Sequence, residues 1–172
     1  MPSQPGLEHV FTLRNYFTKE NIIRIGPIQG DNGPLRMCFP HDDGFLKSAE
    51  GTVIAQVLPG SGDWALVDTS RGIVHLDVRL NLRTTTGGHS IFITYRGVGN
   101  RDEKCKDMLD FLPDATSTEF GDHEYFASPT FETSDPDLKW AESSVFVAEG
   151  RWVCEEGRVA VEYRIWRVRP SK

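Results

Sequence analysis

The residues best suited to chemistry lie in one strand-like segment of the chain. Residues 72–84 read Gly-Ile-Val-His-Leu-Asp-Val-Arg-Leu-Asn-Leu-Arg-Thr, and the side chains of a strand alternate between its two faces. One face is aliphatic, and the other carries an acid, an imidazole, an amide and two guanidinium groups. These polar residues are His75, Asp77, Arg79, Asn81 and Arg83. Such a row supplies proton transfer and oxyanion binding if it lines a pocket, and it is only a wet surface if it faces solvent.

We predict that the face carrying Asp77, Arg79 and Arg83 points into a cavity. The aliphatic face would then pack outward against a covering element or a second subunit, because an exposed aliphatic stripe promotes association. The alternative role for Asp77 and Arg79 is a structural ion pair, since the two lie two residues apart on one face.

Further candidate groups lie beside or within apolar strand sequence. Asp63 follows a glycine-rich turn and precedes Trp64, which fits the rim of a pocket, although Asp is also a common turn residue. Glu132 lies in an apolar strand, where burial would raise the pKa of its carboxyl. Tyr95 lies on an aliphatic face of its strand, so its phenol is either a proton donor or an edge of the core.

No motif for a nucleophile or a cofactor is present. The chain has no Gly-x-Ser-x-Gly, no phosphate-binding loop, no dinucleotide fingerprint and no Cys–His pairing signal. His41 beside Asp42 and Asp43 comes nearest to a metal cluster, but a metal ion needs three or more convergent ligands. We therefore expect no metal and no cofactor, which leaves proton transfer and binding as the available chemistry.

Strand patterns dominate the rest of the chain. They recur roughly every 10–15 residues between Gly, Pro and Asp turns, with almost no helical period, which is typical of an antiparallel barrel or sandwich. The predicted strands span residues 7–17, 22–28, 51–58, 64–67, 72–84, 90–98, 125–133, 144–153 and 158–168, with a turn at 59–62. We therefore predict one all-β domain over residues 1–172.

One segment departs from this pattern. Residues 101–112 place apolar side chains at helical spacing, and Pro113 stops the helix. The polar stretch that follows reads as a loop. We expect the insertion 101–122 to form a short helix and loop over one end of the β-structure, as either a plug of the barrel or a lid over a substrate.

Composition and net charge limit the kinds of molecule that the chain can bind. The chain has 172 residues, a net charge of −6 and a pI of about 5.4, which argues against nucleic acid as a partner. No apolar run approaches the roughly 18 residues that span a bilayer, and the first residues do not resemble a signal peptide. The chain has three cysteines, an odd number, and they lie far apart in the sequence, as is typical of reduced thiols: Cys38, Cys105 and Cys154. We expect a cytoplasmic protein without a membrane or nucleic-acid partner.

Three spaced blocks of sequence resemble the domain-of-unknown-function 3237 family. The first is Val57-Leu-Pro-Gly-Ser-Gly-Asp-Trp-Ala-Leu-Val67, which is similar to a Leu-Pro-Gly-Gly-x-Asp-Trp turn of that family. The second joins Leu76-Asp77-Val78-Arg79 to Leu82-Arg83-Thr84, and the third runs from Tyr125-Phe126 to Phe146-Val147. The segment 39–51 and the long insertion depart from the family pattern at positions that would alter a pocket mouth, so substrate identity does not transfer.

The resemblance implies a calycin-like or lipocalin-like antiparallel β-barrel with a central cavity. Fungal members of the family look like tailoring proteins of aromatic polyketide pathways, where cofactor-free cyclisation or isomerisation is the activity suggested. The resemblance thus points to a small aromatic or hydrophobic substrate in secondary metabolism.

We therefore expect a cofactor-independent cyclase or isomerase that works by acid–base catalysis. The expected catalytic residues are Asp77, Glu132, Arg79, Arg83 and Tyr95. The expected substrate-binding residues are Asp63, Trp64, Trp140 and His41. Two alternatives stay open: a lipocalin-like carrier of a hydrophobic ligand, and a structural barrel that acts only as a homo-oligomer.

Overall fold

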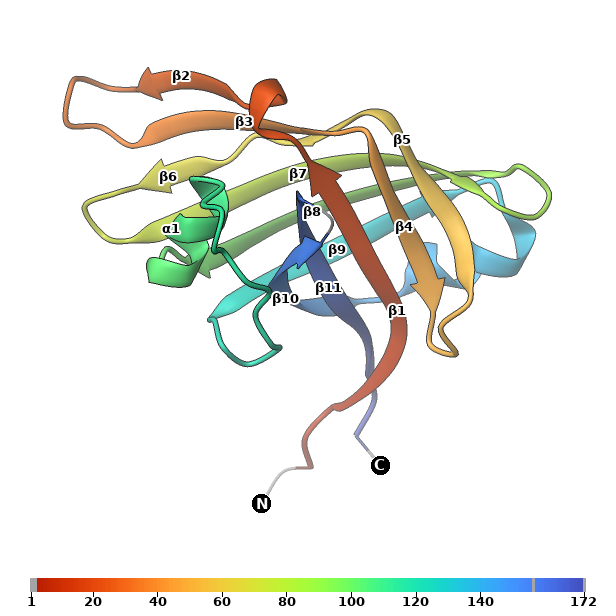
Figure 1. Ribbon diagram of the computed structural model, residues 1–172. Coiled ribbons are helices and arrows are strands. Elements are labelled where there is room, and N and C mark those ends of the chain that lie inside the picture. Colours follow the sequence, from red (N-terminus) through yellow and green to blue (C-terminus); the bar gives the residue numbers. More distant parts are fainter. Residues whose placement is uncertain (1–2, 156, 172) are drawn as a thin grey trace.

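Antiparallel strands make up most of the protein (Figure 1). The computed structural model describes residues 3–155 and 157–171. Its strands are β1 (Gly6–Phe17), β2 (Ile23–Pro27), β3 (Leu35–His41), β4 (Asp43–Ser48), β5 (Val53–Asp63), β6 (Leu66–Asp68), β7 (Ile73–Thr84), β8 (Ser90–Asn100), β9 (Tyr125–Thr133), β10 (Phe146–Glu155) and β11 (Arg158–Arg169). Short helical segments are η1 (Lys19–Asn21), α1 (Glu103–Leu109) and η2 (Pro136–Ser143).

The strands close into a barrel. Neighbours follow the order β5-β4-β1-β11-β10-β9-β8-β7, and β7 pairs back onto β5. Strands β3 and β6 pair with each other and extend the wall at one end, and β2 adds to β3 as an edge strand. The predicted fold class, a single antiparallel β-barrel with one short helical insertion, is confirmed.

Strand β7 shows why the barrel forms and which way its faces point. Its aliphatic residues Val74, Leu76, Val78, Leu80 and Leu82 are all buried inside the barrel. The polar row between them lies on the outer surface, so the prediction that this row points into a cavity is wrong. The physical reason is barrel closure, because the inner face of a small closed barrel must be filled by packed side chains. The aliphatic side chains of β7 pack against side chains of other strands inside the barrel, so no covering element or second subunit is needed to bury them.

The stretch predicted to be a turn is an irregular part of a strand. Strand β5 continues through residues 59–62 to Asp63, and its register against β7 shifts between Leu58 and Gly62. Such an irregularity bends a strand without ending it, and Gly60 adopts a φ of 89° there. The sequence analysis also missed β3 and β4.

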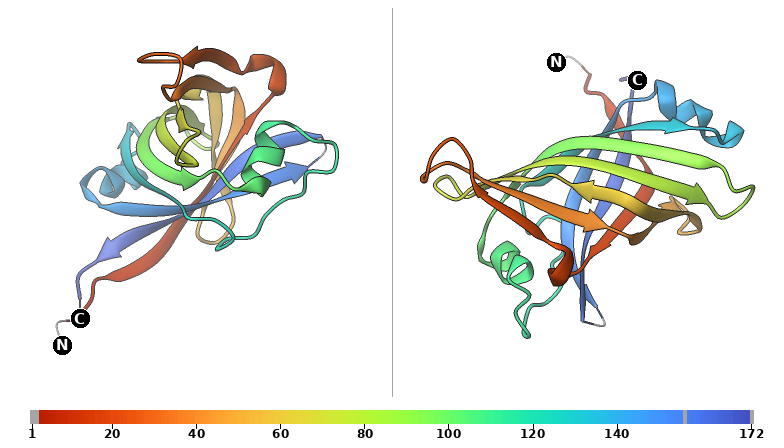
Figure 2. Two further views of the ribbon diagram at one scale, coloured as in Figure 1. Left: turned by 90° about the vertical axis from the view of Figure 1, so that its left-hand side faces the viewer. Right: turned by 90° about the horizontal axis from the view of Figure 1, so that it is seen from above.

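Helical segments cover the two ends of the barrel (Figures 1 and 2). Helix α1 begins at Asp102, whose side chain accepts a hydrogen bond from the backbone N–H of Cys105 (2.8 Å), an N-cap. The helix is shorter than predicted and ends at Leu109, because Phe111 turns the chain with a φ of 53°. Among the described residues, no helix has the length and apolar character needed to cross a membrane.

The end near η2 is filled by aromatic side chains. Phe11 stacks on Trp140 (ring centroids 5.6 Å apart) and contacts Phe131 (5.3 Å), and Phe146 contacts Phe131 at 5.0 Å. Burial of rings of this size contributes strongly to the core. This end therefore leaves little free space, and any site must lie toward α1.

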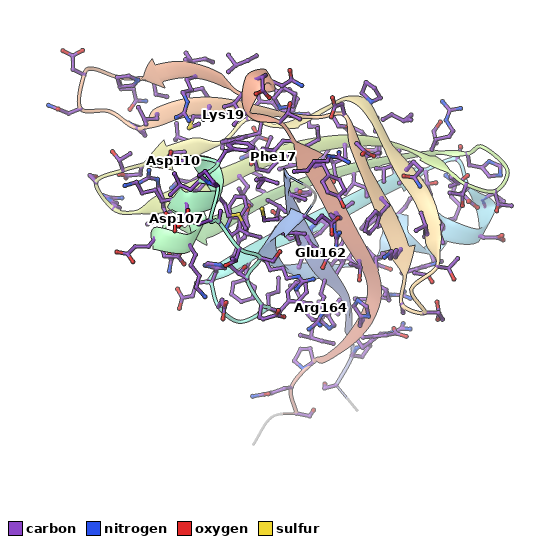
Figure 3. The ribbon with its side chains drawn as sticks, in the orientation of Figure 1. Phe17, Lys19, Asp107, Asp110, Glu162 and Arg164 are labelled. Atoms are coloured by element: carbon purple, nitrogen blue, oxygen red, sulfur yellow. The ribbon has the colours of Figure 1, made fainter. Side chains whose placement is uncertain are left out.

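A buried ion cluster ties three strands together on the outer wall. Glu162 of β11, labelled in Figure 3, lies opposite Arg14 of β1 and Arg151 of β10 in the register. Its side chain is only 7% exposed, and its two oxygens accept hydrogen bonds from Arg14 Nε (2.7 Å) and Arg151 Nη2 (2.8 Å). Each of the three charges stabilises the others, because a buried charge without an opposite charge beside it lowers the free energy of unfolding.

Glu162→Gln should therefore lower the free energy of unfolding by about 3–5 kcal/mol, since both guanidinium groups lose the buried anion between them. Arg14 and Arg151 keep only Glu155 and Glu119, whose side chains are 44% and 81% exposed. Equilibrium unfolding in urea measures this change. The matched control is Glu132→Gln, which neutralises an exposed strand carboxylate and should change stability by about 0.5 kcal/mol or less. Equal effects of the two variants would contradict the cluster's role.

Candidate functional site

A small cavity lies inside the barrel toward the end that α1 covers. The centre of a water molecule can reach about 30 Å³ of it, which is room for roughly one or two waters. Its polar lining residues are His41, Asp63, Tyr95, Asn100, Tyr125 and Tyr163. Apolar rings from Phe17, Phe39 and Trp152 complete much of the wall, with Cys105 and Leu109 contributed by α1.

Asp63 is the acidic residue of this cavity. It is the last residue of β5, it lies opposite Val78 of β7, and it is 8% exposed. Its Oδ1 accepts a hydrogen bond from the backbone N–H of Asp77 (3.0 Å). Burial raises its pKa from 3.8 to about 7, although the Asp77 N–H and the charge of Arg36 act in the opposite direction. Asp63 can therefore both accept and return a proton near neutral pH.

Three tyrosines from three different strands line the cavity together with this carboxyl. Tyr95, Tyr125 and Tyr163 lie on β8, β9 and β11, and the ring of Tyr163 contacts those of Tyr95 (5.2 Å) and Tyr125 (5.6 Å). Burial is the main cause that raises the pKa of all three phenols well above 10, and the charge of Asp63 raises each of them further. The phenols therefore stay protonated and act as hydrogen-bond donors.

Asn15 of β1 extends this polar group deeper into the barrel. Its Nδ2 donates a hydrogen bond to the phenol oxygen of Tyr95 (3.1 Å), and the residue is 0% exposed. Its Oδ1 has no hydrogen-bond partner among the described residues. A buried acceptor without a partner costs about 1–3 kcal/mol, so the fold keeps this amide at a cost.

His41 enters the cavity wall as a neutral imidazole. Burial lowers its pKa to about 4, and its Nδ1 lies 3.3 Å from the backbone oxygen of Tyr16. The neighbouring acids do not join it: Asp42 is exposed, and Asp43 pairs with Arg158 at 2.7 Å. No group of three or more His, Cys, Asp or Glu side chains in the described parts of the chain converges as a metal site.

Cys105 is the thiol that lines the cavity. Burial raises its pKa to about 12, and the negative charge of Asp102 raises it further. The thiolate is the reactive form of cysteine, so Cys105 packs as an apolar group in this environment.

The structure brings together three of the nine predicted site residues. Asp63, Tyr95 and His41 line the cavity. Asp77 and Arg79 lie on the outer wall as a partly solvated pair 3.4 Å apart, with side chains 34% and 47% exposed, and such pairs contribute about 0–1 kcal/mol. They therefore match the alternative reading of an ion pair on a wet sheet face.

The other predicted residues also lie away from the cavity lining. Arg83 and Glu132 are exposed on the outer surface. Trp64 is half-buried outside the barrel, where the guanidinium of Arg79 lies over its ring (5.2 Å to the centroid). Trp140 belongs to the aromatic cluster at the opposite end of the barrel. None of these four side chains lines the cavity inside the barrel, because each follows an outward position of its strand or belongs to a separate core. Their predicted roles stay predictions.

Tyr125, Tyr163 and Asn15 were missed. The alternation of inward and outward side chains along their strands could have identified these three residues. Each takes an inward position, and Asn15 lies between the inward residues Leu13 and Phe17 of β1. A polar residue at a position that the pattern assigns to the core is the feature that marks them.

Comparisons with known proteins agree with this architecture. The family model described as "Protein of unknown function (DUF3237)" matches residues 5–168, which confirms the resemblance. The "PR-toxin biosynthesis cluster protein 7" of Penicillium roqueforti (strain FM164) is 28% identical over 137 residues, which are 78% of this chain and 72% of that protein.

Solved structures show the same fold. A conserved protein of unknown function from Rhodopseudomonas palustris superposes with a TM-score of 0.73 at 20% identity, covering 98% of this chain and 99% of that one. A "beta-barrel like protein" from Acinetobacter baumannii AYE superposes with a TM-score of 0.68 at 21% identity, with the same two coverages.

The raised pKa of Asp63 predicts a pH-dependent stability difference. Its folded pKa of about 7 lies above its ordinary value of 3.8, so the folded state loses stability relative to the unfolded state as pH rises between these values. Asp63→Asn should remove that loss. The variant should match the wild type at about pH 4 and exceed its free energy of unfolding by a few kcal/mol at about pH 8. Urea unfolding across this range measures the difference, and a difference that does not change with pH would contradict it.

Proposed function

The chain belongs to the DUF3237 family of proteins of unknown function, and we propose that it is a cofactor-independent isomerase or cyclase whose site is the barrel cavity. Asp63 acts as the general base and then as the general acid. The observation that carries the proposal is a carboxyl with a pKa of about 7, buried among three phenols in an aromatic cavity. A pKa near the operating pH is what proton transfer in both directions requires.

The reaction needs only proton transfers. The Asp63 carboxylate removes a proton from a carbon or hydroxyl of the substrate, and the electron pair moves toward a carbonyl oxygen or closes a ring. The phenols around it donate hydrogen bonds to the oxygen on which negative charge develops. Asp63 then returns the proton to a different atom, so the substrate is neither oxidised nor reduced.

The substrate class follows from the wall and from the fungal relative. Aromatic rings of Phe17, Phe39 and Trp152 favour a flat, apolar molecule, and the phenols favour one that carries an oxygen acceptor. The name of the Penicillium relative places that protein in a toxin biosynthesis cluster. We therefore propose a small aromatic, polyketide-type molecule of secondary metabolism as the substrate. Space for one or two waters does not admit a ring, so α1 must shift to admit it.

The alternative, a lipocalin-like carrier, draws on the mostly apolar lining. A carrier has no use for a carboxyl held at an energetic cost inside its cavity, because an ordinary apolar side chain would bind the ligand better. Asp63 therefore favours the enzyme over the carrier.

A test of the base uses 5-nitrobenzisoxazole as a probe. A base removes its C3 proton, the N–O bond breaks, and a coloured phenolate is released. The wild-type protein should accelerate this elimination, with a rate that rises with pH around a midpoint of about 7 as Asp63 ionises. Asp63→Asn should lower the rate by about 10²–10⁴-fold.

Glu132→Gln is the matched control, since it neutralises an exposed carboxylate outside the barrel, and its rate should equal that of the wild type. A wild-type rate no greater than that of the Asp63→Asn variant would overturn the proposed base and favour a carrier.

A further inference from the structure

The ring of Tyr125 occupies a seat that two glycines make for it. A Cβ atom placed on Gly99 would lie 2.6 Å from the Tyr125 ring, and one on Gly150 would lie 2.7 Å from its other edge. The ring also stacks on Trp152 with centroids 5.8 Å apart. Three neighbouring strands therefore fix the direction of this phenol within the cavity wall.

Asn15 fixes the hydrogen-bond role of the Tyr95 hydroxyl. Because Asn15 Nδ2 donates to the oxygen of Tyr95 (3.1 Å), the hydrogen of the Tyr95 hydroxyl is left to be donated elsewhere. The ring of Tyr163 contacts those of Tyr95 (5.2 Å between centroids) and Tyr125 (5.6 Å). The three phenols therefore share one region of the cavity wall.

The Asn15 amide is held at an energetic cost. Its Oδ1 is buried and has no partner among the described residues. An apolar side chain of similar size would avoid that cost, so packing alone does not account for an amide at this position. Its directional effect on Tyr95 does account for it.

Resting on the proposed function, we infer that Tyr125 donates the hydrogen bond that stabilises the oxyanion of the substrate, and that Asn15 is a positioning residue that orients the Tyr95 hydroxyl in the same cavity. The substrate must then carry a carbonyl, enol or phenol oxygen at the position that faces Tyr125. Asp63 takes the proton, the electron pair moves onto this oxygen, and the Tyr125 hydroxyl holds the charge until Asp63 returns the proton.

The elimination of 5-nitrobenzisoxazole also tests this inference, because cleavage of its N–O bond places negative charge on an oxygen. Tyr125→Phe keeps the ring in its glycine seat and removes only the donor. It should lower kcat by about 10²-fold, as loss of one oxyanion donor does, with KM within a few-fold. Tyr16→Phe is the matched control, since Tyr16 is the tyrosine outside the cavity lining and bonds to Glu155, and its kcat should not change.

Asn15→Leu tests the positioning role. It should lower kcat by about 3-fold to 10-fold without lowering the melting temperature, because it also removes the unpartnered Oδ1. In a Tyr95→Phe background the same substitution should have no further effect on kcat, since Asn15 acts through the Tyr95 hydroxyl. A loss that adds fully in that background, or that only follows a fall in melting temperature, would overturn the positioning role.

The outcomes separate the two proposals. A Tyr125→Phe variant as fast as the wild type, while elimination still depends on Asp63, overturns the oxyanion role of Tyr125 and leaves the proposed base in place. Elimination that depends on neither residue overturns the proposed function itself.

Discussion

The pairing of β5 with β7 is the interaction on which the rest of the structure depends. It closes the sheet into a barrel, and it decides which side chains lie inside. Along this seam Asp63 lies opposite Val78 on the inner face, and Gly62 lies opposite Arg79, whose side chain is outside. The shift between Leu58 and Gly62 bends β5 without changing which face is inner. One seam thus provides both the closed wall and the buried carboxyl.

Closure also explains the division between the two acids that meet at this seam. The backbone N–H of Asp77 donates a hydrogen bond to Asp63 Oδ1 (3.0 Å), yet the Asp63 carboxyl is inside the barrel and the Asp77 carboxyl is on its surface. The inner carboxyl is desolvated, which raises its pKa to about 7. The outer one is 34% exposed and lies 3.4 Å from Arg79. Identical side chains a few ångströms apart therefore differ in chemistry because the wall separates their environments.

Much of the fold could be predicted from the sequence, because alternation and turn residues are local properties. Strand β9 was predicted with its observed bounds, Tyr125–Thr133, and β1 and β7 within one residue. The inward face of β7 could not be read locally, since either face can be buried and only closure of the barrel decides between them. Asp63 was predicted at a pocket rim, but its burial depends on the irregular strand β5. The glycine-rich stretch 59–62 has the composition of a turn, so the sequence did not indicate that the strand continues through it. The three tyrosines come from separate strands, so their meeting is a product of topology.

The two ends of the barrel are closed in different ways. At the η2 end, stacked rings of Phe11 and Trp140 fill the interior and hold the strands at fixed spacing. At the other end α1 supplies Cys105 and Leu109 to the cavity wall. Its first turn is held by the pair between Asp102 and His123 and by Lys104 and Asp122 at 3.0 Å.

Beyond Leu109 the chain turns through Phe111, whose ring contacts Phe17 edge to face at 5.9 Å. The start of α1 is thus held by polar pairs, whereas Leu109 and Phe111 contact the interior through apolar side chains. Apolar contacts have no fixed direction and can be exchanged for contacts with another apolar molecule at little cost. Entry of an apolar molecule would therefore displace this end of the insertion first, while the polar pairs at its beginning and the polar groups held by the strands stay in place.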